Sequence, residues 1–130
     1  MSARRVLVIE DDDAHRLLLQ EVLEIGGYVV TAIDSAVGAI GIVHDLRPHI
    51  ILLDLGLPLR SGASLLAELK ADPRTADLPV VVVSAMGELL PDERRGQAAA
   101  VVGKPVSPRA LLEILAAVQW PRIADESDET

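Results

Sequence analysis

Two groups of carboxylates in this chain directly follow apolar runs that lie far apart in the sequence. The acidic segment 10–13 follows the apolar residues 6–9, and Asp54 follows the apolar residues 50–53. Both runs are typical of buried parallel strands, whose carboxyl ends lie at the same edge of a sheet. Open α/β sheets bind their ligands at that edge. We therefore expect these carboxylates to form one site.

Such a gathering of negative charge requires compensation. Two unit charges about 4 Å apart repel each other by about 4 kcal/mol at an effective dielectric constant of about 20. Protons or a cation would relieve this repulsion. Because hard divalent cations such as Mg²⁺ bind carboxylate and carbonyl oxygens, the spacing predicts a divalent metal site.

The composition narrows the class of protein. The chain has 130 residues, and 50% of them are hydrophobic, which suffices for one domain with its own core but not for two. It contains no Cys, so disulfides and thiolate chemistry are excluded. We see neither a signal-peptide pattern nor an apolar run long enough to span a membrane. These features predict a single cytoplasmic domain.

The charge distribution disfavours direct binding to nucleic acid. The formal net charge is -8 and the sequence has no basic stripe. Only Tyr28 and Trp120 are aromatic, so base-stacking platforms cannot form. We expect the domain to cover residues 1–121 and the acidic segment 122–130 to be a disordered tail.

Apolar runs alternate with helical patterns, which predicts a parallel sheet covered on both faces. The expected strands are 5–9, 28–33, 49–53, 80–83 and 99–102. The expected helices are 14–25, 35–46, 61–71 and one that begins after Ser107 as N-cap, with Pro108 in its first turn. In the first helix we expect Leu18, Val22 and Ile25 to face the core.

Four motifs resemble those of the receiver domain of two-component response regulators, and they occur in the family's order. They are VLVIEDD, ILLDLGLPLRSG, VVVVSA and VVGKPVSP. The resemblance extends from about Arg5 to Gln119. It implies a receiver with the flavodoxin-like (βα)5 fold and the strand order 2-1-3-4-5. Because only an acidic segment follows Trp120 and Pro121, we expect the stand-alone type.

The resemblance also implies a role for each residue of the site. Asp54 would be the phosphoacceptor. Asp11 and Asp54 would bind Mg²⁺ through side-chain oxygens, Gly56 through its main-chain carbonyl, and Glu10 through a water molecule. Lys104 would balance the charge of the transferred phosphoryl group.

Further residues match the family's pattern around this site. Ser84 would donate a hydrogen bond from its hydroxyl to the bound phosphoryl group. Pro58 and Gly62 would shape the loop after the third strand. Pro105 would follow a cis peptide bond, which is inexpensive only before proline.

The family resemblance implies protein partners on both sides of the reaction. The phosphoryl group would come from a sensor histidine kinase or a histidine phosphotransfer protein. Output would pass to a downstream protein target, with no membrane and no direct nucleic-acid contact. Such a domain is not an enzyme beyond self-phosphorylation and autodephosphorylation at Asp54.

Two departures from the family's pattern concern the switch formed by Ser84 and the residue at position 101. Val101 stands where the family has an aromatic residue, and valine lacks a ring and is stiff at χ1. The interval between Ser84 and Lys104 is about two residues shorter than is usual in the family. It contains Gly87, Pro91 and Gly96 and lacks a long apolar stripe, so we expect a short, irregular or mobile fourth helix.

Two other functions fit parts of the sequence. One is a pseudo-receiver that binds partners without phosphorylation, although the acidic residues and Lys104 are all present. The other is a metal-dependent phosphohydrolase, because residues 11–13 are similar to the D-x-D motif of haloacid dehalogenase-like phosphatases. That function would leave Asp54 without a role.

Acidic residues and histidines also have structural interpretations. Asp13 is expected to be the N-cap of the first helix and Asp12 a solvated neighbour. The histidines His15, His44 and His49 show no metal-ligand spacing, so we expect them at the surface, with His15 beside the mouth of the site.

Overall fold

One parallel sheet forms the centre of the molecule. The computed structural model describes residues 4–57, 61–85, 90 and 95–118. Within them, five strands pair in the order β2-β1-β3-β4-β5. The strands are β1 Arg5–Ile9, β2 Val29–Ile33, β3 Ile50–Asp54, β4 Val80–Ser84 and β5 Ala100–Gly103. The predicted flavodoxin-like topology is confirmed.

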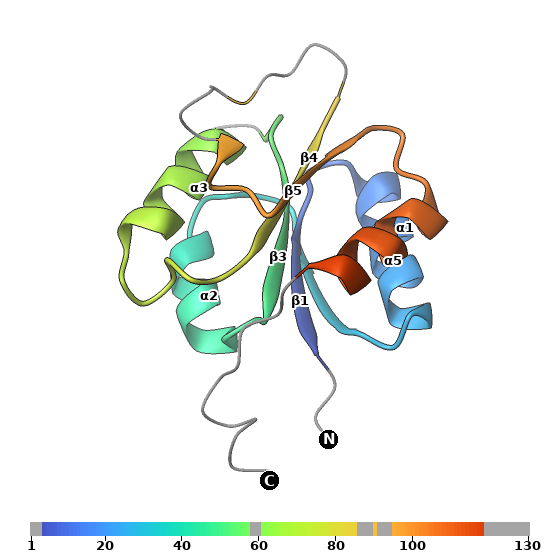
Figure 1. Ribbon diagram of the computed structural model, residues 1–130, viewed down its shortest axis with the longest axis horizontal. Coiled ribbons are helices and arrows are strands. Elements are labelled where there is room, and N and C mark those ends of the chain that lie inside the picture. The colour runs from blue at the N-terminus through green and yellow to red at the C-terminus, as the bar shows by residue number, and fades with distance from the viewer. Residues whose placement is uncertain (1–3, 58–60, 86–89, 91–94, 119–130) are drawn as a thin grey trace, which may run out of the picture.

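Helices cover both faces of this sheet (Figure 1). Helices α2 (Ala39–Leu46) and α3 (Gly62–Ala71) lie on one side, and α1 (Asp13–Ile25) and α5 (Pro108–Ala117) lie on the other. Among the described residues, none of the helices is both long and apolar enough to cross a membrane. Most of the segment expected to form the fourth helix, and the whole acidic segment 122–130, lie outside the described residues.

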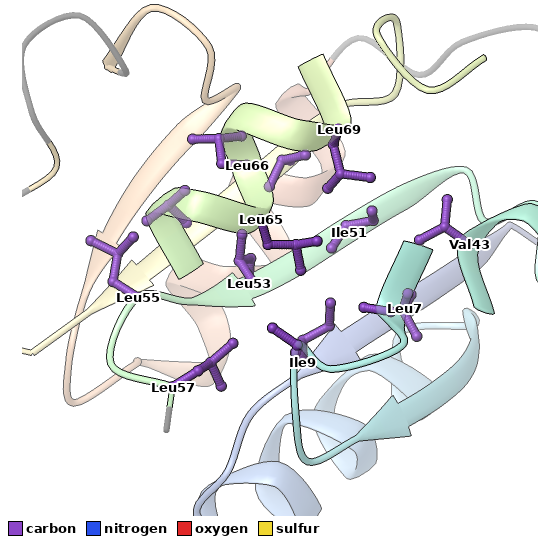
Figure 2. Packing of buried hydrophobic residues seen from close by; sticks show 14 of the residues in the cluster. Leu7, Ile9, Val43, Ile51, Leu53, Leu55, Leu57, Leu65, Leu66 and Leu69 are labelled. Carbon is purple, nitrogen blue, oxygen red and sulfur yellow. The ribbon is translucent and has the colours of Figure 1, made fainter. Parts of the chain in front are cut away.

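Alternation along the strands divides the core into two layers. On one face, strand residues such as Ile51 and Leu53 pack with three leucines of α3, as Figure 2 shows. Those leucines are Leu65, Leu66 and Leu69, all fully buried. On the other face, alternate strand residues including Val8 and Leu52 pack against α1 and α5. A sheet buried on both faces explains why its strands have continuous apolar sequences.

The cap of α1 differs from the prediction by one residue. Asp12 is the N-cap, because its backbone is extended and its side chain accepts a hydrogen bond from the His15 amide at 2.8 Å. Asp13 is instead the first helical residue. At α5 the prediction is confirmed: Ser107 caps the helix, accepting a hydrogen bond from the Ala110 amide, and Pro108 is in the first turn.

The buried face of α1 also differs from the prediction. Leu19 and Leu23 are buried, whereas Leu18 is 41% exposed and Ile25 is 85% exposed. Val22 lies between these sets and packs partly against the core. Both sets have helical spacing, so packing of α1 on the sheet decides which one is buried.

The expectation that His49 lies at the surface is wrong. Its side chain is completely buried at the beginning of β3. The imidazole Nδ1 accepts a hydrogen bond from the Arg5 amide at 2.9 Å, and the His49 amide donates to the Arg5 carbonyl at 2.8 Å. His49 therefore connects the N-terminal ends of β1 and β3, at the edge of the sheet opposite the carboxylates.

Candidate functional site

The register of β1 and β3 brings the two acidic segments together. Ile9 pairs with Leu53, so Glu10, directly after β1, lies beside Asp54, the last residue of β3. The Glu10 amide still donates to the Ile33 carbonyl of β2, at 3.0 Å, which fixes the chain as it leaves β1. Glu10 is only 1% exposed and Asp54 only 3%. Two carboxyl groups are thus buried side by side.

Asp11 completes a cluster that fits a hard cation. One carboxylate oxygen from each of Glu10, Asp11 and Asp54 lies within 4.8 Å of the others. Burial raises the pKa of the Asp54 carboxyl, and so does its hydrogen bond with Glu10, while the Gly56 amide and Lys104 lower it. The pKa is raised mainly because burial disfavours the charged form of the carboxyl group, and the neighbouring Glu10 carboxyl group adds to this effect. An oxygen-only set of ligands is the kind that Mg²⁺ binds.

Lys104 reaches the cluster from the loop after β5. Its Nζ lies 3.2 Å from Glu10 Oε1 and 3.3 Å from Asp54 Oδ2. Burial opposes the charge of this amine, but the attraction of Asp54 and Glu10 is stronger, so the pKa of Lys104 is raised. The amine therefore remains a cation, held between the two buried carboxylates.

The backbone around Lys104 connects it to Ser84. The Lys104 amide donates to the Ser84 carbonyl at 2.9 Å, and Ser84 pairs with Gly103 at the end of β4. The bond between Lys104 and Pro105 is cis, as expected. Since Asp54 pairs with Val83, Ser84 lies at the same edge of the sheet as the acidic cluster.

Asp54 is also held by its own loop. Its Oδ1 accepts a hydrogen bond from the Gly56 amide at 3.1 Å. Gly56 itself is exposed. Pro58, which was expected to shape this loop, lies outside the described residues.

Arg16, in the first turn of α1, holds the acidic segment in place, a role that the sequence did not predict. Arg16 Nη1 donates to the carbonyls of Glu10 and Asp11 at 3.1 and 3.4 Å. Its Nη2 donates to Asp13 Oδ1 at 2.6 Å. The available signal was the spacing of Asp13 and Arg16, three residues apart on one helix. Asp13 thus pairs outward, away from the cluster.

His15 was expected at the surface, but most of its side chain is buried. Its side chain is 16% exposed, and its Nδ1 contacts Glu10 Oε1. The imidazole is therefore part of the site, although its nitrogen atoms do not belong to the group of mutually close ligand atoms. The remaining histidine, His44, is partly exposed and lies 3.4 Å from Asp72, far from this edge.

Val101 occupies an outward position on β5. It pairs with Val82 and is 53% exposed. The branched side chain thus stands on the surface near the site without the reach of a ring.

Comparisons with known proteins agree on one family. The sequence model for the response regulator receiver domain matches residues 6–116. The phosphate regulon transcriptional regulatory protein PhoB of Pseudomonas aeruginosa is 32% identical over 123 residues, which are 91% of this chain and 52% of PhoB. The polar-differentiation response regulator DivK of Brucella anthropi is 28% identical over 114 residues, 86% of this chain and 93% of DivK. The chain spans about half the length, or less, of the first curated relatives it matches.

Solved structures show the same fold. A CheY-like response regulator receiver domain from Methylobacillus flagellatus superposes with a TM-score of 0.82 at 26% identity, over 91% of this chain and all of that one. A sensor protein from a Polaromonas species superposes with a TM-score of 0.81 at 31% identity, over 90% of this chain and 96% of that one. The fold and the order of the site's elements are therefore shared.

Proposed function

This chain belongs to the response regulator receiver domain family, and we propose that it accepts a phosphoryl group on Asp54 from a histidine kinase or a histidine phosphotransfer protein. The observation that supports this most strongly is the position of Lys104. Its amine lies 3.2 and 3.3 Å from the Glu10 and Asp54 carboxylates, which are buried beside each other. The Asp54 carboxyl group, a cationic amine and a cluster of carboxylate oxygens thus lie in one place.

The acidic cluster would hold Mg²⁺. Asp11 and Asp54 would bind through side-chain oxygens, Gly56 through its carbonyl, and Glu10 through water. Bound there, Mg²⁺ would neutralise charge on the phosphoryl oxygens during transfer.

Asp54 would act as the nucleophile. One of its carboxylate oxygens forms a bond to phosphorus while the bond from phosphorus to the donor's imidazole nitrogen breaks. The donor's histidine keeps the electron pair of that bond. Lys104 balances the negative charge of the phosphoryl oxygens, and the Ser84 hydroxyl donates a hydrogen bond to one of them.

The output would pass through contacts with another protein in the cytoplasm. A net charge of -8 opposes direct contact with nucleic-acid phosphates. PhoB is named as a transcriptional regulator, but this chain aligns with only 52% of its length. The name of PhoB therefore does not extend to this receiver domain, for which we propose a protein target.

Phosphorylation of the purified full chain tests the proposal. The wild type and Asp54→Asn are incubated with Mg²⁺ and acetyl phosphate, and intact mass is measured before and after mild base. We expect one base-labile phosphoryl group on the wild type and none on the variant.

Two other outcomes would replace the proposal. Phosphate located by peptide mapping on Asp11 or Asp13 would support the phosphohydrolase. A folded wild type that takes up no phosphate from acetyl phosphate, phosphoramidate or a phosphorylated histidine phosphotransfer protein would indicate a pseudo-receiver.

A further inference from the structure

Glu10 has an unusual set of partners for a residue that would reach the metal only through water. Its Oε1 contacts both Lys104 Nζ, at 3.2 Å, and His15 Nδ1. Its Oε2 accepts a hydrogen bond from the Asp12 amide at 3.3 Å. The carboxyl group is almost fully buried, so these contacts decide its orientation.

Glu10 also forms a hydrogen bond with Asp54, and its other two side-chain partners, Lys104 and His15, differ in their further contacts. Lys104 is shared with Asp54, whose Oδ2 lies 3.3 Å from Nζ. A phosphoryl group on Asp54 would attract this amine more strongly than Glu10 does, because it carries more negative charge. His15, by contrast, contacts Glu10 and shows no contact with Asp54 among the described residues.

The backbone of His15 is fixed independently. Its amide donates to the Asp12 carboxylate that caps α1, at 2.8 Å. The other ring nitrogen, Nε2, is buried and has no hydrogen-bond partner among the described residues. A hydrogen there would be left unpaired, which is costly, so we assign the ring hydrogen to Nδ1. Nδ1–H then donates to Glu10 Oε1.

We propose that His15 is a positioning residue of the metal site, which holds the Glu10 carboxyl group in the orientation that binds the metal's water. This inference rests on the proposed function of the cluster and assigns to it a residue outside the family's motifs quoted above. Hydrogen-bond partners of metal-binding groups orient those groups, and their loss typically weakens metal binding by about 10-fold to 100-fold. Glu10 keeps Lys104 and the Asp12 amide without His15, so we expect the lower end of that range.

The test measures Mg²⁺ affinity of the full chain directly, by isothermal titration calorimetry. His15→Leu replaces the imidazole with an apolar side chain of similar size and so removes the Nδ1–H donor. His15→Asn places an amide nitrogen near the position of Nδ1. We expect about a 10-fold weaker affinity for the leucine variant, and an affinity within about 3-fold of the wild type for the asparagine variant. Urea unfolding without Mg²⁺ shows that each variant is folded.

Three outcomes would overturn the proposal. The leucine variant could bind Mg²⁺ as tightly as the wild type. The asparagine variant could bind as weakly as the leucine variant, which would show that the ring acts by packing alone. The wild type could fail to bind Mg²⁺ at all.

These measurements are separate from the test of Asp54. A wild type that binds Mg²⁺ but takes up no phosphate would end the proposed phosphotransfer and leave the role of His15 to be decided by the two variants. Normal phosphate uptake together with equal Mg²⁺ affinities in all three proteins would reject the role of His15 alone.

Discussion

Gly62 lies so close to Asp54 that a Cβ atom on it would be 2.3 Å from the Asp54 carbonyl oxygen. The same atom would lie 2.8 Å from Leu55 Cα. The Gly62 amide donates to the Leu55 carbonyl at 3.1 Å. Helix α3 therefore begins directly against the end of β3, and the absence of a side chain at position 62 allows Asp54 to keep its place.

Gly62→Ala should accordingly damage both stability and the site. The clash is with backbone, which cannot rotate away, so we expect the free energy of unfolding to fall by roughly 1–3 kcal/mol. Displacement of the Asp54 backbone should also slow phosphorylation by acetyl phosphate. Urea unfolding and the rate of mass increase measure the two effects.

The matched control is Gly41→Ala in α2. Gly41 is exposed, and among the described residues outside its own helical turn no atom lies within 4 Å of the position that a Cβ would take. We expect the free energy of unfolding of this variant to rise by up to about 1 kcal/mol, because alanine favours the helix. Equal changes at both positions would contradict the close approach of Gly62.

Asp11 and Asp13 should respond differently to loss of charge. Asp11 belongs to the oxygen cluster, whereas the Asp13 side chain is 90% exposed and bonded to Arg16. We expect Asp11→Asn to weaken Mg²⁺ binding by more than about 10-fold, since even outer partners of a metal contribute that much. Asp13→Asn should stay within about 2-fold of the wild type, because surface ion pairs contribute little. Calorimetric titration with Mg²⁺ distinguishes the two, and a larger effect at position 13 would refute this assignment of ligands.

The fold and much of the site could be predicted because they follow from strand ends. Each strand was anticipated to within a residue or two, and strands of a parallel sheet end at one edge. The positions of Asp54, Asp11 and Lys104 relative to one another are consequences of that topology. The family's motifs supplied the strand order, which periodicity alone does not contain.

The predictions that were wrong concern which side chains are buried, because burial depends on how the elements pack. Helix α1 carries two overlapping apolar stripes, and the sequence could not show that Leu19 and Leu23, rather than Leu18 and Ile25, would face the sheet. His49 has no sequence pattern to reveal that its ring accepts the Arg5 amide. Both outcomes depend on contacts between segments far apart in the chain.

Asp72 should contribute a pH-dependent part of the stability. Hydrogen bonds from the Arg74 side chain and amide, with a further contribution from His44, lower the pKa of Asp72 from 3.8 to about 2. Because the folded pKa is the lower one, the stabilisation is present above pH 3.8 and is lost as the pH falls towards 2. We expect Asp72→Asn to be less stable than the wild type at pH 6.

The difference between these two proteins should shrink when urea unfolding is repeated at pH values from about 5 down to 2.5. Arg74→Met removes the main partner and should abolish most of the same pH dependence. A difference that stays constant over this range would show that Asp72 acts through its shape and not through its charge.

Neighbouring valines of β5 should differ in what they contribute. Val101 is 53% exposed, whereas Val102 is 7% exposed and belongs to the core layer beneath α1 and α5. Val102→Ala removes buried methyl groups and should cost roughly 1–3 kcal/mol of unfolding free energy. Val101→Ala should change it by less than about 0.5 kcal/mol, as is usual for surface positions.

A phosphorylation assay distinguishes an effect of Val101 on function from its effect on the stability of the protein. Because its side chain points away from the core and the acidic cluster lies beyond the strand end, Val101→Ala should accept phosphate at the wild-type rate. Intact mass at several times after addition of acetyl phosphate measures that rate. A marked slowing without loss of stability would mean that this valine is coupled to Asp54 after all, and that β5 takes part in switching without an aromatic ring.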